Sequence, residues 1–366
     1  MTQLGGAERV AGRLARRFPD ADLYTSTHRP DVVPLPAIGG RAWQTSFLQP
    51  AASRVNLKTM LPLMPLAIAS LPVGEHDLVM SSSSAFAHHA RSGRDALHVC
   101  YCHTPPRFLW QSDAYFKGRP ALHTSLAPLL AVLRKLDRRA AARVDAYFAV
   151  SRHVAARIAQ VYGRPAHTVH PPVDVESFAP SRERSGRFLV LSRLVASKRV
   201  DLVVEAANRF ALPLDVIGTG PRLRALRRMA GPTVRVLGWQ SDAAVREALA
   251  TCEAVVIAGE EDFGLVTVEA QASGRPPVAF AAGGALEIIE HGTTGYLVEA
   301  QDPDSIAGAM LRAREGRLAV SDLVASSRRF DFACFNERFD AALADAKAQA
   351  TGRVATREAF VTEAGS

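Results

Sequence analysis

The stretch that decides the fold is GEEDFGLVTVEAQASGRPPVAF, residues Gly259–Phe280. The apolar run EAVVIAG leads into an acidic turn that contains Glu261, a helical pattern containing Glu269 follows, and PPVAF then has the pattern of another strand. Short apolar strands separated by amphipathic helices predict a parallel sheet covered on both faces. Because such sheets bind ligands at the carboxyl ends of their strands, Glu261 on the loop and Glu269 on the helix are the first candidates for a binding site.

The same alternation of strands and helices continues through the second half of the chain, from Gly186 onward. The first half also contains apolar strand patterns with helices between them, and a segment rich in Pro, Ser and charge, 170–186, separates the halves. We therefore expect an α/β protein with two doubly wound, Rossmann-like domains that face each other across a cleft. The predicted divisions are 1–175 and 176–328, a helix at 329–348 that returns toward the N-terminal domain, and a disordered tail at 349–366.

Composition limits the class of protein. The 366 residues are 48% hydrophobic and 22% charged, which is typical of a soluble globular chain with room for two cores. The formal net charge of +8 indicates an anionic partner, either a phosphorylated substrate, a nucleic acid or an acidic membrane. No basic stretch interleaved with aromatic residues and no zinc-finger spacing occurs, so we expect no nucleic-acid partner.

Two further strand exits carry candidate residues for an anion site. Arg193 and Lys198 follow the strand RFLVLSR, and a diphosphate needs such cations; the alternative is two solvated bases on a basic protein. Gly218 and Gly220 follow the strand LDVIG, where glycine lets the backbone approach a ligand closely.

The N-terminal half offers two more candidates. Gly5 and Gly6 precede an amphipathic helix and would present backbone N–H groups to an anion, unless they form an ordinary glycine turn. His103 ends the strand LHVCYCH ahead of a proline-stiffened loop, where it either faces a ligand or is a satisfied core histidine.

No metal site is expected. The set Cys100, Cys102 and His103 is a poor one, because adjacent residues of a strand point to opposite faces. The Asp-x-Asp patterns at residues 20–22 and 302–304 lie at loop-to-element junctions, where helix caps are expected.

With these residues assembled, the sequence resembles glycosyltransferase family 4, the retaining nucleotide-sugar transferases with the GT-B fold, over nearly the whole chain. The most specific feature is Glu261-x7-Glu269, followed by GGALEIIEHGTTGYLV. The stretches GGAER, CHTPPRFLW, VSRHVAARI, HPPVD and LSRLVASKRVDLVVEA occur in the order that the family shows. Within it, GGAERV, FPDADLYT, CHTPPRFLW and EDFG are most similar to bacterial mannosyltransferases that use GDP-mannose to build O-antigen or exopolysaccharide repeats.

The resemblance implies what each candidate does. Glu261 would hold hydroxyls of the donor sugar and Glu269 the ribose, while Arg193 and Lys198 would hold the diphosphate and His103 would contact the reacting sugar. The implied catalytic residues are His103, Arg193, Lys198 and Glu261, and the implied donor-binding residues are Gly5, Gly6, Gly218, Gly220, Phe263, Gly264, Leu265 and Glu269.

The resemblance also implies partners. Domain 1–175 would bind a polyprenyl-linked or saccharide acceptor, and domain 176–328 the nucleotide-sugar donor. Transfer would retain the anomeric configuration without a metal or cofactor. The donor would be GDP-mannose, with a UDP-sugar as the alternative, and we expect a cytoplasmic protein.

One departure from the family concerns the N-terminus. Members begin with a β-strand before the Gly-Gly loop, whereas only MTQL precedes Gly5, so the first strand of the N-terminal sheet is apparently missing. An inactive GT-B scaffold is therefore an alternative to an active transferase; an epimerase on the same fold is a weaker one.

The basic helix at 125–144 has a leucine-rich face. It either lies against the anionic inner face of the cell membrane or packs on the sheet with a solvated basic face.

Overall fold

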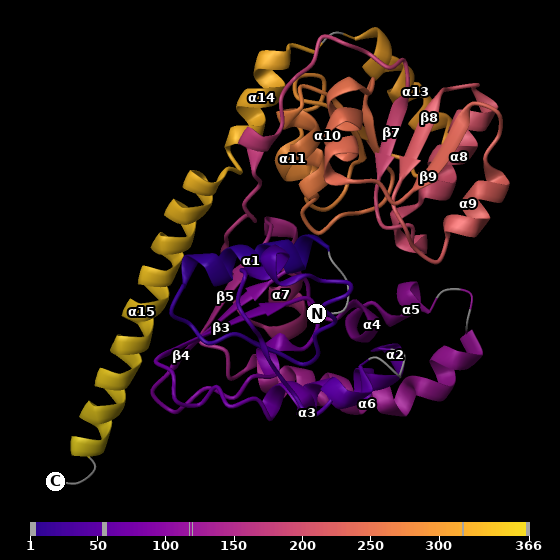
Figure 1. Ribbon diagram of the computed structural model, residues 1–366. Coiled ribbons are helices and arrows are strands. Elements are labelled where there is room, and N and C mark those ends of the chain that lie inside the picture. The colour runs from indigo at the N-terminus through magenta and orange to yellow at the C-terminus, as the bar shows by residue number, and fades with distance from the viewer. Residues whose placement is uncertain (1–4, 53–56, 117, 119, 317, 364–366) are drawn as a thin grey trace. The chain divides into compact units, whose positions relative to one another are not determined.

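The computed structural model describes residues 5–52, 57–116, 118, 120–316 and 318–363 (Figure 1). The chain divides into two compact units, of which unit 1 contains Met1–Val169 and Arg338–Ser366, and unit 2 contains His170–Glu337. The first limit lies a few residues before the predicted boundary at 175. Each unit is built around its own parallel sheet, so the predicted α/β fold with two sheets is confirmed.

Unit 2 contains a six-stranded parallel sheet in the order β12-β11-β10-β7-β8-β9. The strands are β7 (Phe188–Leu191), β8 (Leu214–Ile217), β9 (Val234–Gly238), β10 (Val255–Ile257), β11 (Pro277–Phe280) and β12 (Tyr296–Val298). The chain moves outward from β7 to β9, then returns to the other side of β7 and moves outward again from β10 to β12. The strand order therefore reverses between β7 and β10, and in doubly wound sheets the ligand binds at that reversal, outside the carboxyl ends of the two strands.

Helices cover both faces of this sheet. They are α8 (Val200–Arg209), α9 (Leu223–Met229), α10 (Asp242–Thr251), α11 (Leu265–Ala272), α12 (Ala285–Ile288), α13 (Pro303–Glu315) and α14 (Val320–Arg328). Val190, Val216 and Val256 belong to a core shared with α8 and α13, whereas Leu189 and Val255 belong to a second core shared with α10 and α11. Because both faces are buried around the middle of the sheet, β7, β10 and β11 are continuous apolar runs, whereas β8 and β9 contain Asp215 and Arg235.

Unit 1 contains a four-stranded parallel sheet in the order β3-β4-β5-β6 and a two-stranded parallel ladder of β1 and β2. The strands are β1 (Tyr24–Thr25), β2 (Gln44–Thr45), β3 (Leu78–Ser83), β4 (Leu97–Cys102), β5 (Ala146–Ala149) and β6 (His167–Thr168). The helices are α1 (Gly6–Arg17), α2 (Leu57–Met60), α3 (Met64–Ala69), α4 (Arg107–Trp110), α5 (Ser112–Tyr115), α6 (Pro120–Ala141) and α7 (Arg152–Tyr162).

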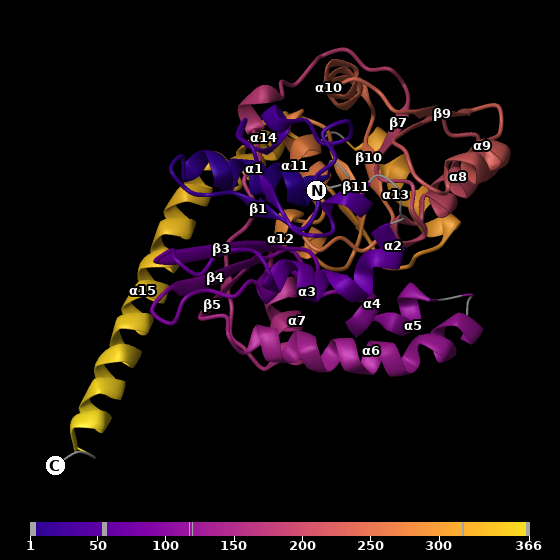
Figure 2. The same cartoon turned by 60° about the horizontal axis from the view of Figure 1, so that its bottom comes forward.

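Successive residues of β5 point to opposite faces of the unit 1 sheet. Tyr147 stacks on Tyr162 of α7, with ring centroids 5.9 Å apart. Phe148 packs against Phe339 of helix α15 (Phe332–Glu363), with ring centroids 5.6 Å apart. Phe339 is fully buried and also contacts Phe18. The first part of the C-terminal helix therefore packs on the sheet face opposite α7 through Phe339, while the rest of the helix extends past the edge of the sheet (Figure 2). It continues to Glu363 across most of the segment for which the sequence predicts a disordered tail.

Helix α6 presents two different faces. Leu130, Leu133 and Asp137 are buried against the rest of unit 1, whereas Leu129 and Val132 are exposed. Among the described residues, no helix combines the length and the apolar character needed to cross a bilayer.

A histidine is buried within the unit 1 sheet. His98 of β4 has no exposed surface, and its Nε2 lies 3.0 Å from Ser81 Oγ. Loss of hydration on burial lowers the pKa of His98 to about 3 from its usual 6.5, because the charged imidazolium is disfavoured there. The folded protein thus holds this ring neutral over a pH range in which the unfolded chain protonates it.

This buried histidine predicts acid sensitivity. Between pH 6.5 and 3 the unfolded chain binds one more proton at His98 than the folded chain, so stability is highest above pH 6.5 and falls as the pH drops. The free energy of unfolding should fall by up to about 1.4 kcal/mol per pH unit from this group. Urea titrations at pH 7 and pH 5 measure the change, and His98→Gln should flatten it. An unchanged slope in that variant would assign the acid sensitivity to other groups.

Candidate functional site

The carboxyl ends of β7 and β10 bring together two predicted site residues. Lys198 follows β7 and Glu261 follows β10, and Lys198 Nζ donates a hydrogen bond to Glu261 Oε2. The two side chains are 20% and 23% exposed, so water and a ligand can both reach the pair. The residues predicted for diphosphate and sugar hydroxyls therefore form one ion pair at the strand-order reversal of unit 2.

Close backbone packing fixes where Lys198 lies. It ends the 3-10 helix Ala196–Lys198, and the next residue, Arg199, has a φ of 49°, a left-handed conformation that turns the chain into α8. Gly259, just after β10, is packed so closely that a Cβ there would lie 2.6 Å from the carbonyl oxygen of Ser197. The loop after β10 therefore needs glycine at 259 in order to reach the loop after β7.

Two glycines after β11 support the Glu261 loop in the same way. Gly283 pairs with Glu261 as an isolated parallel bridge, and the Gly284 N–H donates to the Glu261 carbonyl at 2.9 Å. A Cβ on Gly283 would collide with that carbonyl, and one on Gly284 with the carbonyl of Phe263. Neither glycine is among the site residues predicted from the sequence. Their adjacency directly after a buried strand, in FAAGGALE, is the signal that could have found them.

Gly218 and Gly220 allow two loops of unit 2 to pack closely against each other. Their φ angles are 140° and 154°. A Cβ on Gly218 would collide with the carbonyl oxygen of Ser192, and one on Gly220 would lie 2.5 Å from that of Leu194. The Leu194 N–H also donates to the Thr219 carbonyl at 2.8 Å. The two glycines thus lock the loop after β8 to the loop that carries Arg193 and Lys198, while the predicted approach to a ligand stays a prediction.

Gly218→Ala tests this packing. The new methyl group must displace the Ser192 carbonyl, so we expect a loss of unfolding free energy of about 1–3 kcal/mol from overpacking in addition to the backbone strain. Gly292→Ala is the matched control, since Gly292 also has a positive φ, 81°, but no atom lies within 4 Å of the added Cβ. Urea denaturation of both variants measures the difference. If both variants lost the same unfolding free energy, backbone strain alone, without the contact to Ser192, would explain why residue 218 is glycine.

Helix α11 begins at the same loop. Its N-cap is Gly264, with a φ of 102°, Leu265 is its first residue, and Glu269 lies half-buried one turn further on. The helix start presents backbone N–H groups and the positive end of the helix dipole. These three predicted donor-binding residues lie on one connected segment with Glu261.

Phe263 is the predicted donor-binding residue whose side chain points inward. Its ring is 5% exposed and packs against His170 and Phe330, with centroids 5.5 and 5.3 Å away. His170 Nε2 in turn lies 2.9 Å from Glu287 Oε2. Phe263 therefore anchors the loop through its side chain, so any contact with a ligand there would come from its backbone.

Arg193 lies exposed in the loop after β7, five residues before Lys198. Its carbonyl accepts the Val195 N–H at 2.9 Å and the Ser192 hydroxyl at 3.1 Å, which holds the loop in a tight turn. Unit 2 therefore places two cations and the start of a helix on adjoining loops. Such a set attracts a phosphate group.

The candidates of unit 1 lie at two places. Gly5 is the N-cap of α1, where its N–H donates to the Glu8 carboxylate at 3.0 Å. This amide, predicted to face an anion, thus has an intramolecular acceptor in this structure, and Gly6 begins the helix. His103 is half-buried after β4, and its Nε2 lies 2.9 Å from Ser82 Oγ.

The acidic pairs behave partly as predicted. Asp302 caps α13 through its Oδ1, which accepts the Ser305 N–H at 2.8 Å, so that cap prediction is confirmed. Asp20 and Asp22 precede strand β1 and cap no helix, so the prediction is wrong there. Asp22 instead lies 3.6 Å from His76.

Two family models match the chain, one in each half. "Glycosyltransferase Family 4" matches residues 4–177 and "Glycosyl transferases group 1" matches residues 185–315. The structure is similar to that of HepE from Anabaena in complex with UDP and glucose, with a TM-score of 0.71 and 20% sequence identity, over 94% of this chain and 97% of that one. The two α/β units thus have the GT-B fold.

Two curated relatives are glycosyltransferases. The chain is 33% identical to a GDP-mannose-dependent alpha-(1-6)-phosphatidylinositol monomannoside mannosyltransferase of Mycolicibacterium smegmatis, over 55% of this chain and 58% of that protein. It is 28% identical to a D-inositol 3-phosphate glycosyltransferase of Acidothermus cellulolyticus, over 95% of this chain and 87% of that protein. The chain therefore spans less than two thirds of the first relative and most of the second. The N-terminal half is thus similar to glycosyltransferase family 4 and the C-terminal half to glycosyl transferases group 1.

Proposed function

We propose that this protein is a retaining glycosyltransferase that moves mannose from GDP-mannose to a lipid-linked or oligosaccharide acceptor in cell-surface polysaccharide synthesis. The observation that carries the proposal is the Lys198–Glu261 pair at the strand-order reversal of unit 2, next to Arg193 and the start of α11. A nucleotide sugar has a diphosphate between two polyols. It therefore needs cations flanked by hydrogen-bond acceptors, and these residues provide both.

The Lys198–Glu261 pair gives this site a defined way to accept its ligand. A donor diphosphate takes over Lys198 Nζ together with Arg193, which releases the Glu261 carboxylate to accept hydrogen bonds from the sugar hydroxyls. The existing ion pair holds the lysine extended toward its binding position, so less side-chain freedom is lost on binding. Glu269, one helical turn into α11, is the proposed partner of the ribose.

The proposed chemistry needs no metal and no protein nucleophile. The bond from the sugar anomeric carbon to the β-phosphate oxygen breaks, and its electron pair stays on the nucleoside diphosphate, where Lys198 and Arg193 stabilise the developing charge. The acceptor hydroxyl attacks the same face and passes its proton to the leaving phosphate. For Gly5, Gly6 and His103 the contacts to the phosphates or acceptor and to the reacting sugar stay predictions from the sequence.

GDP-mannose is the proposed donor because the first relative above is named as GDP-mannose-dependent. A thermal-shift screen against GDP, GDP-mannose, UDP, UDP-glucose and UDP-N-acetylglucosamine tests it, since a ligand that binds the folded state raises the melting temperature. We expect GDP and GDP-mannose alone to do so. If only the uridine ligands raised the melting temperature, the donor would be a UDP-sugar and the protein would still be a glycosyltransferase. If no ligand raised it, the result would support the inactive scaffold.

Two variants locate the donor site in the same screen. Lys198→Ala should abolish most of the shift given by GDP, because the diphosphate loses a cation, while Glu261→Gln should spare GDP binding and weaken only the extra binding given by the sugar. Arg209→Ala is the control, because Arg209, at the end of α8, is an exposed cation that pairs with Asp304 of α13. If GDP raised the melting temperatures of Lys198→Ala and Arg209→Ala equally, Lys198 would not be part of the donor site.

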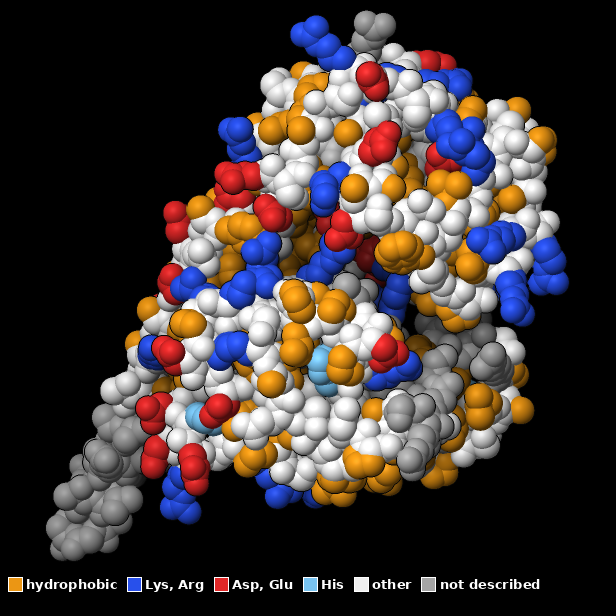
Figure 3. Space-filling model, viewed as in Figure 1, with side chains coloured by type: hydrophobic (Ala, Val, Ile, Leu, Met, Phe, Trp, Pro, Cys, Tyr) orange, Lys and Arg blue, Asp and Glu red, His pale blue; other side chains and the backbone are white. Residues whose placement is uncertain are grey.

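We also propose that unit 1 binds an anionic membrane surface through α6, as a cytoplasmic protein with a polyprenyl-linked acceptor would. Exposed apolar side chains recur along this helix at helical spacing, and Figure 3 shows hydrophobic side chains along the edge of unit 1 where α6 lies. They are Leu122, Leu129, Val132 and Leu136, which are 43%, 38%, 57% and 41% exposed. Lys135, Arg138 and Arg139 of the same helix are exposed too and would meet lipid phosphates.

Flotation with vesicles tests this surface. The protein should float with vesicles that contain anionic phospholipid and stay in the soluble fraction with neutral ones. The double variant Val132→Glu/Leu136→Glu should lose most of the binding, because it removes apolar area and adds negative charge. Leu237→Glu, at an exposed leucine of unit 2, is the matched control. The proposal fails if wild-type protein stays soluble with the anionic vesicles.

A further inference from the structure

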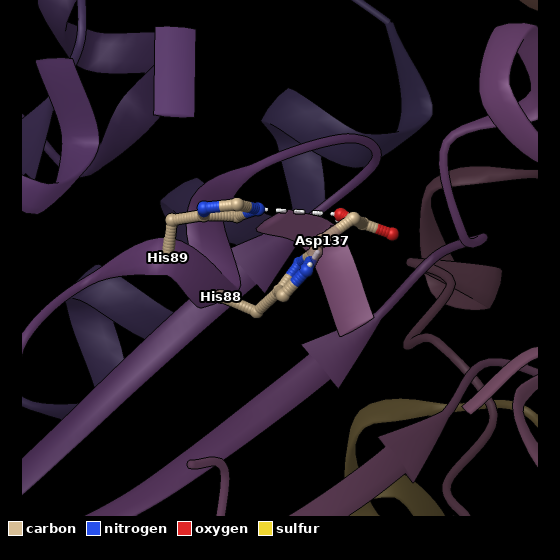
Figure 4. A group of neighbouring side chains, drawn as sticks. All are labelled: His88, His89 and Asp137. Atoms are coloured by element: carbon tan, nitrogen blue, oxygen red, sulfur yellow. Dashed lines mark hydrogen bonds and ion pairs between the residues drawn. The ribbon is translucent and has the colours of Figure 1, made fainter. Parts of the chain in front are cut away.

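Unit 1 buries three groups that can ligate a metal, and the proposed transfer uses none of them. His88 and His89 lie in the 3-10 helix Ala87–His89 that follows β3, and Asp137 lies on α6. Their exposed fractions are 2%, 4% and 0%. Figure 4 shows both rings turned toward the Asp137 carboxylate.

The spacing of the three groups matches a coordination shell. His88 Nε2 and His89 Nε2 lie 3.0 and 3.3 Å from Asp137 Oδ1, and the ligand atoms of all three residues lie within 4.8 Å of one another. Zinc binds nitrogen and carboxylate oxygen at about 2.0–2.2 Å in tetrahedral sites, which separates neighbouring ligand atoms by about 3.3 Å. An ion therefore fits among these atoms with small adjustments.

His88 Nε2 provides the second reason. Although it lies 3.0 Å from Asp137 Oδ1, it makes no hydrogen bond, because the alignment is poor. A buried nitrogen that lacks a well-aligned hydrogen bond is costly. A cation bound by both atoms satisfies them together, since each then directs a lone pair at the ion.

The buried negative charge of Asp137 also favours a bound cation. Among the described residues, the ion-pair contacts of Asp137 are to His88 and His89 alone. Within the described part of the chain, the buried carboxylate therefore has no lysine or arginine partner. A carboxylate in the core is stabilised by a nearby cation. A divalent ion supplies the missing charge.

The surrounding groups would orient these ligands. Asp137 Oδ2 accepts hydrogen bonds from Trp110 Nε1 and the Tyr162 hydroxyl, each at 2.7 Å, which leaves Oδ1 for a metal. His88 Nδ1 lies 3.3 Å from Ser83 Oγ. When Nδ1 carries the ring proton, the Nε2 lone pair is free to bind a metal. Metal-bound histidines and carboxylates in proteins are held by outer contacts of this kind.

We propose that His88, His89 and Asp137 bind one zinc ion, with a buried water as the fourth ligand, and that this ion ties β3, α6, α4 and α7 together. Its role is structural. The donor chemistry proposed above lies in unit 2 and does not involve it.

The test uses full-length protein without a polyhistidine tag, treated with a chelator and dialysed, to which zinc is then added. We expect one zinc per chain by mass spectrometry and a higher melting temperature with zinc than without it. Cobalt in place of zinc should give the absorption bands of tetrahedral coordination. No retained zinc together with no change in melting temperature overturns the proposal, and this measurement on wild-type protein needs no variant to fold.

Variants then place the ion. His88→Gln and His89→Gln should lose the stoichiometric zinc, and Ser83→Ala should weaken binding by about 10–100-fold because it removes an outer contact. His123→Gln is the matched control, since His123 lies on α6 away from the cluster and pairs with Asp113. Zinc bound equally well by His89→Gln and His123→Gln would show that the ion binds elsewhere and would also overturn the proposal.

Discussion

The pairing of β7 with β10 is the constraint on which the rest of unit 2 depends. These strands lie side by side, with Leu189 opposite Val255, although two strands and three helices separate them along the chain. Their adjacency creates the strand-order reversal and points two loops in the same direction. Lys198 and Glu261, which are 63 residues apart in sequence, can meet only because of it.

Glycines allow those loops to approach closely enough for the pair to form. Gly218 and Gly220 lie against the loop after β7, Gly259 lies against residues 197 and 198, and Gly283 lies against the carbonyl of Glu261. Any side chain at these positions would push the loops apart. The proposed donor site is thus assembled by backbone contacts, and its charged side chains project from a scaffold that side-chain packing alone could not bring so close.

Unit 1 uses a different means to join its elements. Its sheet buries polar groups on the face toward α7, where Ser81 and His98 lie in contact and Asp137 accepts hydrogen bonds from Trp110 and Tyr162. Such networks stabilise a protein only when every member is satisfied. His88 Nε2 and His98 Nδ1, which make no hydrogen bond, are therefore the exceptions in this region.

The sequence by itself determined the fold class, the alternation in unit 2 and the candidates at its strand exits, because apolar periodicity and the residues that end each strand are local properties. The helix cap at Asp302 was equally local. Only the tertiary structure decided that Lys198 pairs with Glu261, that Phe263 points inward, and that Gly283 and Gly284 support the site. It also placed two histidines beside Asp137, which neither hydropathy nor motif spacing indicated. These contacts join segments far apart in the chain, and their partners are fixed by strand order and backbone approach, which no local pattern encodes.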